Sequence, residues 1–284
     1  MTTTDTYYVY LDSEQADQVG DSLHRKFKFP LAPTVKAVSP EIGSMYIKDF
    51  TIFNDFKNVN YTNDTATITI GSNPPTSITL TQGHYKTGQD LINHIKNIVS
   101  AAANIDLSLW TFNPVTLKGE FNYTESLQFS GKIFTDMFNL EEDKIYGAGL
   151  AVSNKEVDIN KHLHNVFVSV SEITTNSITV GSALNIPNRI CKIPIVTGHS
   201  GYVVFQPIIP QRVPVVNTLL SNLTLRLYLD DGVTIESDKF TATVVIEITK
   251  PTNPNPHAIR DVPNGYYSNG AQQPVLYPNV YRKC

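Results

Sequence analysis

Three histidines, His162, His164 and His199, have the sequence surroundings that come nearest to a catalytic or metal-binding motif. His199 belongs to Gly-His-Ser-Gly at positions 198–201, one residue short of the Gly-x-Ser-x-Gly elbow that exposes the serine nucleophile of many hydrolases. Strand-like segments flank this motif and no helix pattern follows it, so we interpret it as a tight turn. A hydrolase on a β scaffold stays open as an alternative, in which His199 or the pair His162 and His164 gathers partners through space.

His162 and His164 stand two residues apart, a spacing that places both side chains on one face of a strand. Two imidazoles on one face could bind a metal ion, but no third Cys, His or carboxylate has a matching spacing. The acidic stretches 141–143 and 230–231 lack the alternating oxygen ligands and the glycine of an EF-hand loop. We interpret these histidines and carboxylates as solvated, and we expect no metal site, no cofactor and no small-molecule substrate.

The other local motifs of enzymes are absent from the sequence, which has no phosphate loop, no Gly-x-Gly-x-x-Gly, no His-Glu-x-x-His and no Cys-x-x-Cys. Cys191 lies in an apolar strand-like run, where we expect a small buried side chain. With Cys284 as the second cysteine, the chain cannot form a disulfide framework, and two free thiols are expected. The sequence therefore predicts a protein that is not an enzyme.

Strands are predicted along most of the chain, because apolar and polar residues alternate with a period of two. The clearest segments are residues 26–29, 45–53, 67–70, 77–80, 106–112, 117–123, 127–129, 166–170, 190–196, 223–229 and 243–248. Residues 67–80 read as a hairpin, and Asp231-Gly232 supplies a turn of the positive-φ kind that hairpins require. Strands do not alternate regularly with helices, which excludes a doubly wound α/β fold and favours an antiparallel sandwich.

Two segments change to the 3.6-residue period of a helix. Leu91, Ile95, Ile98, Val99 and Ala102 fall on one stripe, and Thr87 precedes Asp90 as in a capping box, which predicts a helix over residues 88–103. A second helix of about two turns is expected after Ser130 as its cap, with a buried stripe of Ile133, Phe134, Met137 and Phe138. Residues 141–151 contain acidic residues and glycines and predict a loop.

The two ends of the chain contain few aliphatic residues. Residues 1–24 are polar, and we interpret them as an N-terminal arm outside the core. Residues 250–284 predict an extended Pro- and Tyr-rich tail, whose tyrosines would need a partner surface to bury against; these are Tyr266, Tyr267, Tyr277 and Tyr281. Between the ends, we expect residues 25–57 and 161–249 to form the sandwich and residues 58–160 an inserted β-rich domain with one or two short helices.

The overall charge argues against a protein that coats nucleic acid. The chain has 22 Lys and Arg against 26 Asp and Glu, a net charge of −4, whereas nucleic-acid coats are strongly basic. Arg25, Lys26 and Lys28 form one basic cluster near an aromatic strand. We interpret this cluster as a candidate assembly contact, either with an acidic neighbour or, weakly, with packaged DNA.

The sequence shows no address for export or for a membrane. Its start lacks the basic and apolar regions of a signal peptide, and no apolar run is long enough to cross a bilayer. Four Asn-x-Ser/Thr sequons stand at Asn60, Asn63, Asn122 and Asn222, and we attribute them to chance in a chain rich in Asn and Thr. We expect a soluble protein that is made without a signal peptide and is not inserted in a membrane.

Three stretches carry a resemblance to a known family. Residues 78–85, with Gly83-His84-Tyr85 leading into the helix at 91–93, form a strand, Gly-x-Tyr, helix module. Residues 127–140 and the late strand 223–232 also fit, although Phe138-Asn139-Leu140 stands where Leu-Gly-Phe is usual. Over roughly residues 25–249 the chain resembles the minor capsid, or penton, proteins of virophages and Polinton-like double-stranded DNA viruses.

The resemblance implies a jelly roll with an inserted β-rich domain that forms a homopentamer at each icosahedral vertex of the virion. The pentamer would sit among copies of the major capsid protein and would need no cofactor and no active site. Polar and Tyr-rich arms at both ends suit cyclic assembly, because arms can extend over neighbouring subunits. The alternative is a viral receptor-binding or lectin-like β-sandwich, against which we note that Trp110 is the only tryptophan available as a sugar platform.

Overall fold

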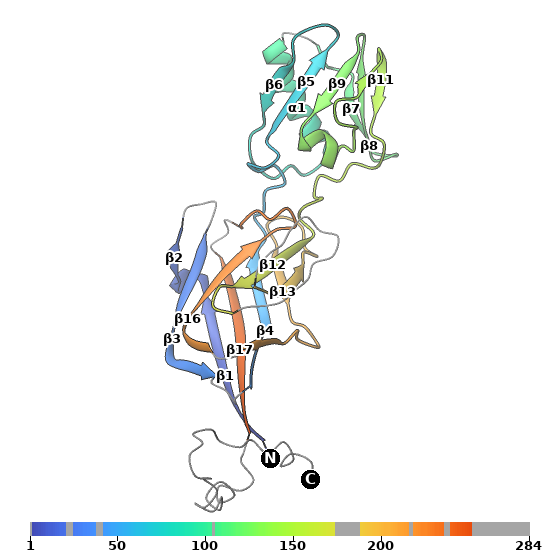
Figure 1. Ribbon diagram of the computed structural model, residues 1–284. Helices are drawn as coiled ribbons and strands as arrows, with labels where there is room; N and C mark the ends of the chain where they lie inside the picture. The colour runs from blue at the N-terminus through green and yellow to red at the C-terminus, as the bar shows by residue number, and fades with distance from the viewer. Residues whose placement is uncertain are drawn as a thin grey trace, which may run out of the picture.

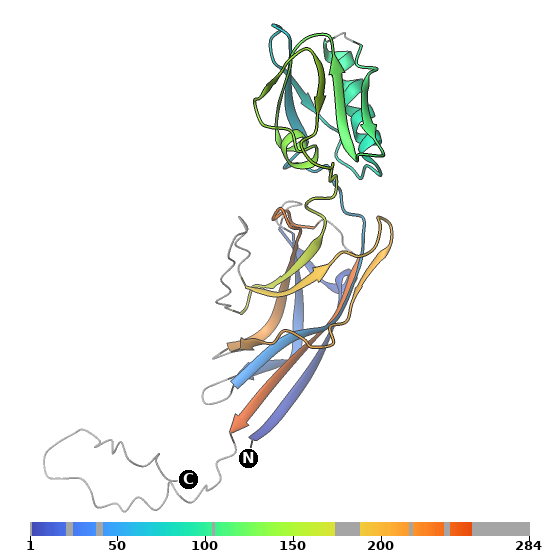
Figure 2. The same ribbon diagram turned by 90° about the vertical axis from the view of Figure 1, so that its right-hand side faces the viewer.

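A computed structural model describes residues 2–20, 25–37, 42–103, 106–173, 188–215, 218–235 and 239–251. Figures 1 and 2 show an elongated molecule with two lobes, joined by two crossings of the chain. Each lobe has its own hydrophobic core. One core takes buried residues from Leu11 to Phe56 and from Leu163 to Ile248, and the other takes buried residues from Val59 to Ile159. We call these the jelly-roll lobe and the inserted lobe.

In the residues that the structure describes, the jelly-roll lobe has two five-stranded antiparallel sheets. The first has the order β1-β17-β4-β14, with β15 also paired to β4; the strands are β1 (Thr2–Asp12), β4 (Ile42–Phe53), β14 (Tyr202–Phe205), β15 (Val213–Val215) and β17 (Phe240–Pro251). The second has the order β13-β12-β16-β3-β2; the strands are β2 (Asp17–Val19), β3 (Lys26–Ala37), β12 (Asn165–Val170), β13 (Arg189–Pro194) and β16 (Thr218–Tyr228).

The strand order is that of a jelly roll. The main strands run β1-β17-β4-β14 in one sheet and β3-β16-β12-β13 in the other, so successive strands mostly cross between the sheets. The expected antiparallel jelly-roll sandwich is therefore confirmed. Apolar residues that alternate along the strands form its core: Leu223, Leu225 and Leu227 are fully buried on β16, as are Val244 and Ile246 on β17.

Residues 2–12 are a strand of the first sheet, so the expectation of an N-terminal arm is wrong for this segment. β1 pairs with β17 along its whole length, from Thr2 opposite Pro251 to Asp12 opposite Thr241, and Leu11 lies in the core. The sequence hides this strand because it lies at an edge and has one exposed face, so polar residues occupy most of its outward positions.

The same pairing corrects the start of the C-terminal tail. β17 continues through Lys250 to Pro251, and the Lys250 Nζ atom lies 2.7 Å from Oδ2 of Asp5 on β1. The remaining tail, residues 252–284, lies outside the described residues. The four tyrosines named above as candidate contacts belong to that segment.

The inserted lobe lies between β4 and β12 in the chain and contains two smaller sheets. One has the order β10-β9-β5-β6; the strands are β5 (Thr65–Ile70), β6 (Thr76–Thr79), β9 (Leu127–Ser130) and β10 (Ile145–Tyr146). The other has the order β11-β8-β7; the strands are β7 (Trp110–Asn113), β8 (Lys118–Tyr123) and β11 (Gly149–Val152). The loop expected over residues 141–151 thus contains two short strands.

Helix α1 (Gly88–Ala103) agrees with the prediction. Its capping box is reciprocal: the Thr87 backbone N–H donates to Asp90 Oδ2, and the Asp90 N–H donates to Thr87 Oγ1, both at 3.1 Å. Leu91, Ile95 and Val99 on its apolar stripe are fully buried.

The second expected helix is a single π-helical turn, η2 (Ile133–Met137), and Ser130 does not cap it. Gly131 and Asn139 on its two sides both have a positive φ, which ends the helical path in both directions. The residues expected to be buried are buried nonetheless, because Phe134 and Phe138 pack with Phe121 in an aromatic core.

If β1 belongs to the core, substitutions on its two faces should change the free energy of unfolding by different amounts. Leu11→Ala should lower the free energy of unfolding by about 2–4 kcal/mol, because a buried leucine leaves a cavity when it is truncated. Thr6→Ala, on the exposed face of β1, should change it by less than about 0.5 kcal/mol. Urea denaturation of both variants measures the difference, and an equally small effect of both would show that β1 lies outside the core.

Candidate functional site: the polar junction between the lobes

The chain passes between the lobes twice, through residues 54–63 on the way out and residues 158–165 on the way back (Figure 1). Four asparagines on the outward crossing are buried, with exposed fractions of 6, 0, 5 and 5% for Asn54, Asn58, Asn60 and Asn63. Buried amides must form hydrogen bonds to be tolerated. We call this hydrogen-bonded region the polar junction.

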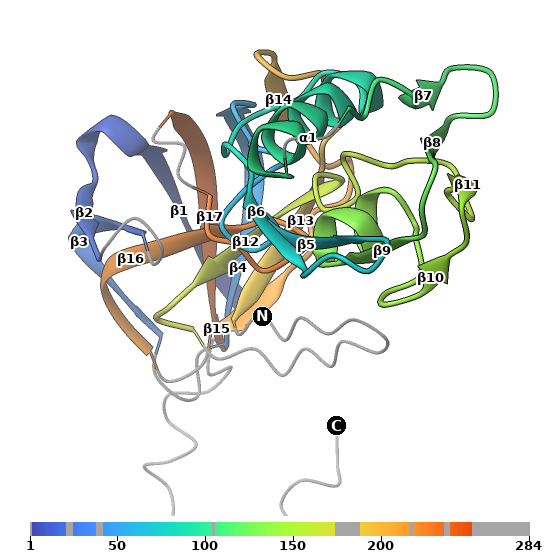
Figure 3. The ribbon, with the colours of Figure 1, turned by 90° about the horizontal axis from the view of Figure 1, so that it is seen from above.

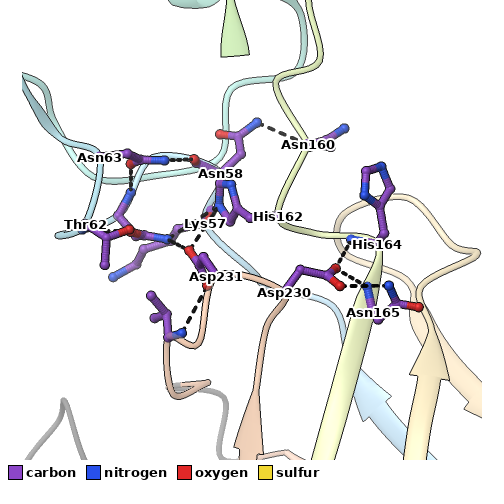
Figure 4. Close-up of polar contacts among 12 residues, drawn as sticks. Lys57, Asn58, Thr62, Asn63, Asn160, His162, His164, Asn165, Asp230 and Asp231 are labelled. Atoms are coloured by element: carbon purple, nitrogen blue, oxygen red, sulfur yellow. Dashed lines mark hydrogen bonds and ion pairs between the residues drawn. The ribbon is translucent and has the colours of Figure 1, made fainter. Parts of the chain in front are cut away.

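Asn58 joins the outward crossing to the inserted lobe and to the return crossing. Its Nδ2 atom donates to the Tyr85 carbonyl at 2.8 Å, and its Oδ1 atom accepts from the Tyr85 N–H at 2.8 Å. Nδ2 also lies 3.3 Å from Oδ1 of Asn160 (Figure 4). Next to these bonds, Val59 and Gly83 form an isolated antiparallel bridge. One side chain therefore fixes three segments of the chain.

Asn60 and Asn63 join the inserted lobe to the jelly-roll lobe. Asn60 Oδ1 accepts from the N–H and the hydroxyl of Thr62, and Asn60 Nδ2 donates to Oδ2 of Asp231 at 3.1 Å. Asn63 accepts from the Asn60 N–H at 2.8 Å and donates to the Asn58 carbonyl at 3.0 Å. Asp231 belongs to the turn that follows β16, so the two lobes share one hydrogen-bond network.

Asn54 holds the turn expected at residues 198–201. Its Nδ2 atom donates to the carbonyls of Thr197 and Gly198 at 3.0 and 3.2 Å. The Gly201 N–H donates back to the Gly198 carbonyl at 3.2 Å, and Ser200 has a φ of 66°. The Gly-His-Ser-Gly motif is thus a tight turn, as predicted.

His162 and His164 each lie near a different carboxylate. The Nε2 atom of His162 is 3.9 Å from Oδ2 of Asp231 and 3.4 Å from the Lys57 carbonyl oxygen, whereas Nε2 of His164 is 3.6 Å from Oδ2 of Asp158. Figure 4 shows the two rings pointing in different directions, and both residues precede β12. Within the described ranges, no group of three His, Cys, Asp or Glu side chains is placed to hold a metal ion.

Asp230 positions the return crossing. Its Oδ2 atom accepts from the N–H groups of His164 and Asn165 at 2.9 and 2.7 Å, and its Oδ1 atom accepts from Asn165 Nδ2 at 2.8 Å (Figure 4). These bonds attach the start of β12 to the turn after β16. The acidic pair Asp230-Asp231, expected to be solvated, instead connects the crossings to the jelly-roll lobe.

Within the described residues, His199 contacts a serine hydroxyl but not the carboxylate that a hydrolytic triad would require. Its Nδ1 atom lies 2.9 Å from the Ser200 hydroxyl, and its ring stacks on the His84 ring with centroids 4.0 Å apart, so the third group is a second imidazole and not a carboxylate. The described contacts of His162 with Asp231, Asn60 and Lys57 include no hydroxyl or thiol nucleophile. Burial raises the pKa of the Cys191 thiol to about 12, so this cysteine is not an activated nucleophile.

Two of the predicted contact residues lie on a strand of the jelly-roll lobe, and Trp110 lies in the inserted lobe. Lys26 and Lys28 are on β3, where they alternate with the buried Phe27 and Phe29, and Lys28 lies opposite Asp17 of β2. Trp110 is fully buried in the inserted lobe and cannot serve as a sugar platform.

The junction asparagines were not predicted from the sequence as functional residues. In the sequence, Asn60 and Asn63 stand out only as sequons, and burial of both amides agrees with attributing those two sequons to chance. The signal that the sequence does offer is the close spacing of these four asparagines between two segments with strand patterns.

A cavity of about 190 Å³ opens beside the junction, with walls from both lobes. Its lining includes Phe56 and Tyr61 from the outward crossing and Leu229, Val233 and Ile235 from the segment at the end of β16 and after it. It is smaller than the pockets of roughly 300–1,000 Å³ that usually hold small-molecule ligands.

Neither a protein-family model nor a curated protein matches the chain in sequence. Its fold is similar to the crystal structure of the selenomethionine-labelled mavirus penton protein, with a TM-score of 0.50 and 8% sequence identity. The match covers 87% of this chain and 99% of that chain. The two proteins therefore share a fold, and the resemblance inferred from the sequence is confirmed at that level. In the part of the chain that the structure describes, no helix is long and apolar enough to cross a membrane.

Loss of the Asn58 amide should weaken the junction. Asn58→Ala leaves the N–H and carbonyl of Tyr85 without these partners in a partly buried site, which we expect to cost about 1–3 kcal/mol of unfolding free energy. Asn122→Ala, at an exposed position of β8, is the matched control and should have little effect. Chemical denaturation compares the two variants, and equal stabilities would contradict the structural role of Asn58.

Acid should loosen the contact between His84 and His199. Burial, and then the neighbouring His199, lower the pKa of His84 below 6.5. The unfolded chain therefore binds this proton more readily, so the contribution of His84 is fully present above its unfolded pKa and is lost as the pH falls through 6.5 towards the folded pKa. Thermal unfolding at about pH 7.5 and about pH 5 should show a smaller pH effect in His84→Gln than in the wild type, since only the wild type carries this group. The same pH effect in both proteins would contradict the assignment.

Proposed function

We propose that this chain is a minor capsid (penton) protein, which forms a homopentamer at the five-fold vertices of an icosahedral virion and contacts the surrounding major capsid protein. The shared fold carries this proposal, since the match spans 99% of a penton protein. The topology adds support, because a complete jelly roll accommodates a whole folded lobe between β4 and β12 without interrupting either sheet.

The two lobes suit different tasks in such an assembly. We propose that residues 58–160 form the inserted domain and that residues 25–57 and 161–249, together with strand β1, form the jelly-roll domain that packs within the shell. The inserted lobe lies at the end of the molecule opposite the start of β1, where β17 ends beside it (Figures 1 and 2). A vertex protein built this way can present one lobe away from the end where the tail departs.

The predicted contact residues keep their proposed roles. Residues 252–284, with their four tyrosines, are proposed to contact neighbouring capsid subunits. Lys26 and Lys28 alternate with core residues on β3, as a contact surface on a rigid strand requires, and with Arg25 they are proposed to meet an acidic neighbour or, weakly, packaged DNA.

A structural role also agrees with the chemistry of the site. The buried asparagines and the aspartates of the junction are engaged with one another and with the backbone, which stabilises one arrangement of the lobes. We therefore propose that the protein acts in the virion without catalysis and without a cofactor.

Light scattering of the purified protein, at several concentrations and with and without the major capsid protein, tests the proposal. We expect a molar mass of about 158 kDa, five times the 31.6 kDa of the chain, either alone or when the partner is present. A monomer or a trimer that is indifferent to the partner would contradict it and would favour the receptor-binding alternative.

A further inference from the structure

One edge of the jelly-roll lobe exposes an unusual number of large apolar side chains. Residues 188–215 form β13, β14, β15 and their connections, and the exposed fractions there reach 77% at Val196, 60% at Tyr202, 58% at Val204, 100% at Ile208 and 87% at Ile209. The β13 strand and the 205–211 connection line a common cavity, so the edges of both sheets meet here. Soluble monomers rarely leave such surfaces uncovered.

The opposite edge of the lobe has a similar character. Residues 2–20 form β1, the short 3-10 turn η1 (Ser13–Gln15) and β2, and they expose Tyr8, Tyr10 and Val19. Figures 1 and 3 show β1 and β2 on the side of the lobe away from β13 and β14. Among the described strands, β1 pairs only with β17 and β14 only with β4, so both edges have free backbone groups.

The two edges carry opposite charge. Residues 2–20 contain Asp5, Asp12, Glu14 and Asp17 with no Lys or Arg, and we call them the acidic edge. Residues 188–215 contain Arg189, Lys192 and Arg212 with no Asp or Glu, and we call them the basic edge.

Some of these charges are balanced within the chain. Asp5 pairs with Lys250, Arg212 pairs with Glu247 at 3.1 Å, and Asp17 lies opposite Lys28. At the acidic edge this leaves Asp12 and Glu14, which lie in and beside η1.

At the basic edge, Arg189 and Lys192 remain. Both lie over the Phe167 ring, at 5.4 and 5.9 Å from its centroid, and neither forms an ion pair with a described carboxylate. The segment of each edge therefore combines exposed apolar groups with charge opposite to that of the other segment, and Lys48 of β4 also lies over the Tyr8 ring at the acidic edge, 5.1 Å from its centroid.

We propose that the acidic edge of one copy binds the basic edge of the next copy, so that the chains join head to tail in a closed ring. Because the two contact surfaces differ and lie on opposite sides of one lobe, the contact repeats from copy to copy instead of ending at a dimer. This inference deepens the proposed vertex function and rests on it only for the number of copies in the ring.

Side chains, and not a continuous sheet, form the contact. Pro194, Pro207, Pro210 and Pro214 lie along the basic edge and lack the N–H groups that a regular strand ladder requires. Tyr8 and Tyr10 supply aromatic surface opposite the apolar groups of Ile208 and Ile209, and Asp12 and Glu14 face Arg189 and Lys192 across the contact.

Two variants that each disable one edge test the proposal. Tyr8→Ser with Tyr10→Ser removes the apolar surface of the acidic edge, and Ile208→Ser with Ile209→Ser removes that of the basic edge. All four side chains are exposed, so folding should be retained, as circular dichroism can verify. By sedimentation velocity, each variant alone should need at least about tenfold higher concentration to assemble than the wild type, as expected when interface anchors are lost.

Mixing the two variants gives the sharper result. Each retains one intact edge, so the mixture should form heterodimers and nothing larger. Leu109→Ser with Leu150→Ser, at exposed positions of the inserted lobe, is the matched control and should assemble like the wild type. Self-association of the Ile208/Ile209 variant into dimers would instead show that the acidic edge binds its own copy, which would overturn the proposal.

These experiments test the edge contact and the five-fold role separately. Edge variants that still form pentamers would overturn the edge contact and leave the proposed function standing. A wild-type ring of another number that both edge variants dissociate would support the edge contact and contradict the five-fold role. A wild type that stays monomeric even with the major capsid protein would contradict both.

Discussion

The placement of one lobe on the other depends on hydrogen bonds made by buried amides. Asn58 is fully buried, and burying an amide without a partner costs roughly 2–7 kcal/mol, so only an arrangement that satisfies it is stable. Tyr85 supplies backbone bonds from the inserted lobe, and Asp231 and the 197–198 carbonyls supply bonds from the jelly-roll lobe. Hydrogen bonds are directional, so they fix the orientation of one lobe relative to the other. Apolar contact alone would not fix this orientation. A vertex protein needs such an orientation, because each copy must present the same shape to its neighbours.

The jelly-roll lobe obeys a second constraint, which is that the first and last described strands of the chain pair with each other. β1 and β17 pair along their whole length and bring residues near both ends into one sheet. The insertion departs from the other end of the lobe, between β4 and β12, and so leaves the ladders intact. The chain therefore separates the jelly-roll lobe from the inserted lobe, and among the described strands β1 and β14 each leave one side unpaired.

Much of this fold could be predicted from the sequence, and the failures have physical causes. The period of two in β16 and the 3.6 period of α1 are strong because each element has one buried face, and Thr87 and Asp90 marked the helix start correctly. β1 was missed because half of an edge strand faces solvent and its core residues are few. The junction was missed because polar residues between strands normally indicate a loop, and only the folded chain brings Asn60 to Asp231, 171 positions apart.

The likeness of fold to a penton protein, the open edges with opposite charge and the fixed orientation of the lobes lead to one central claim, that the chain is built to form a five-fold vertex. Electron microscopy of the purified assembly, with the major capsid protein added where assembly requires it, tests that claim most directly. The account predicts class averages with five-fold symmetry and five inserted lobes projecting on one side of a ring. Averages with two-fold or three-fold symmetry, or single particles without symmetry, would contradict it.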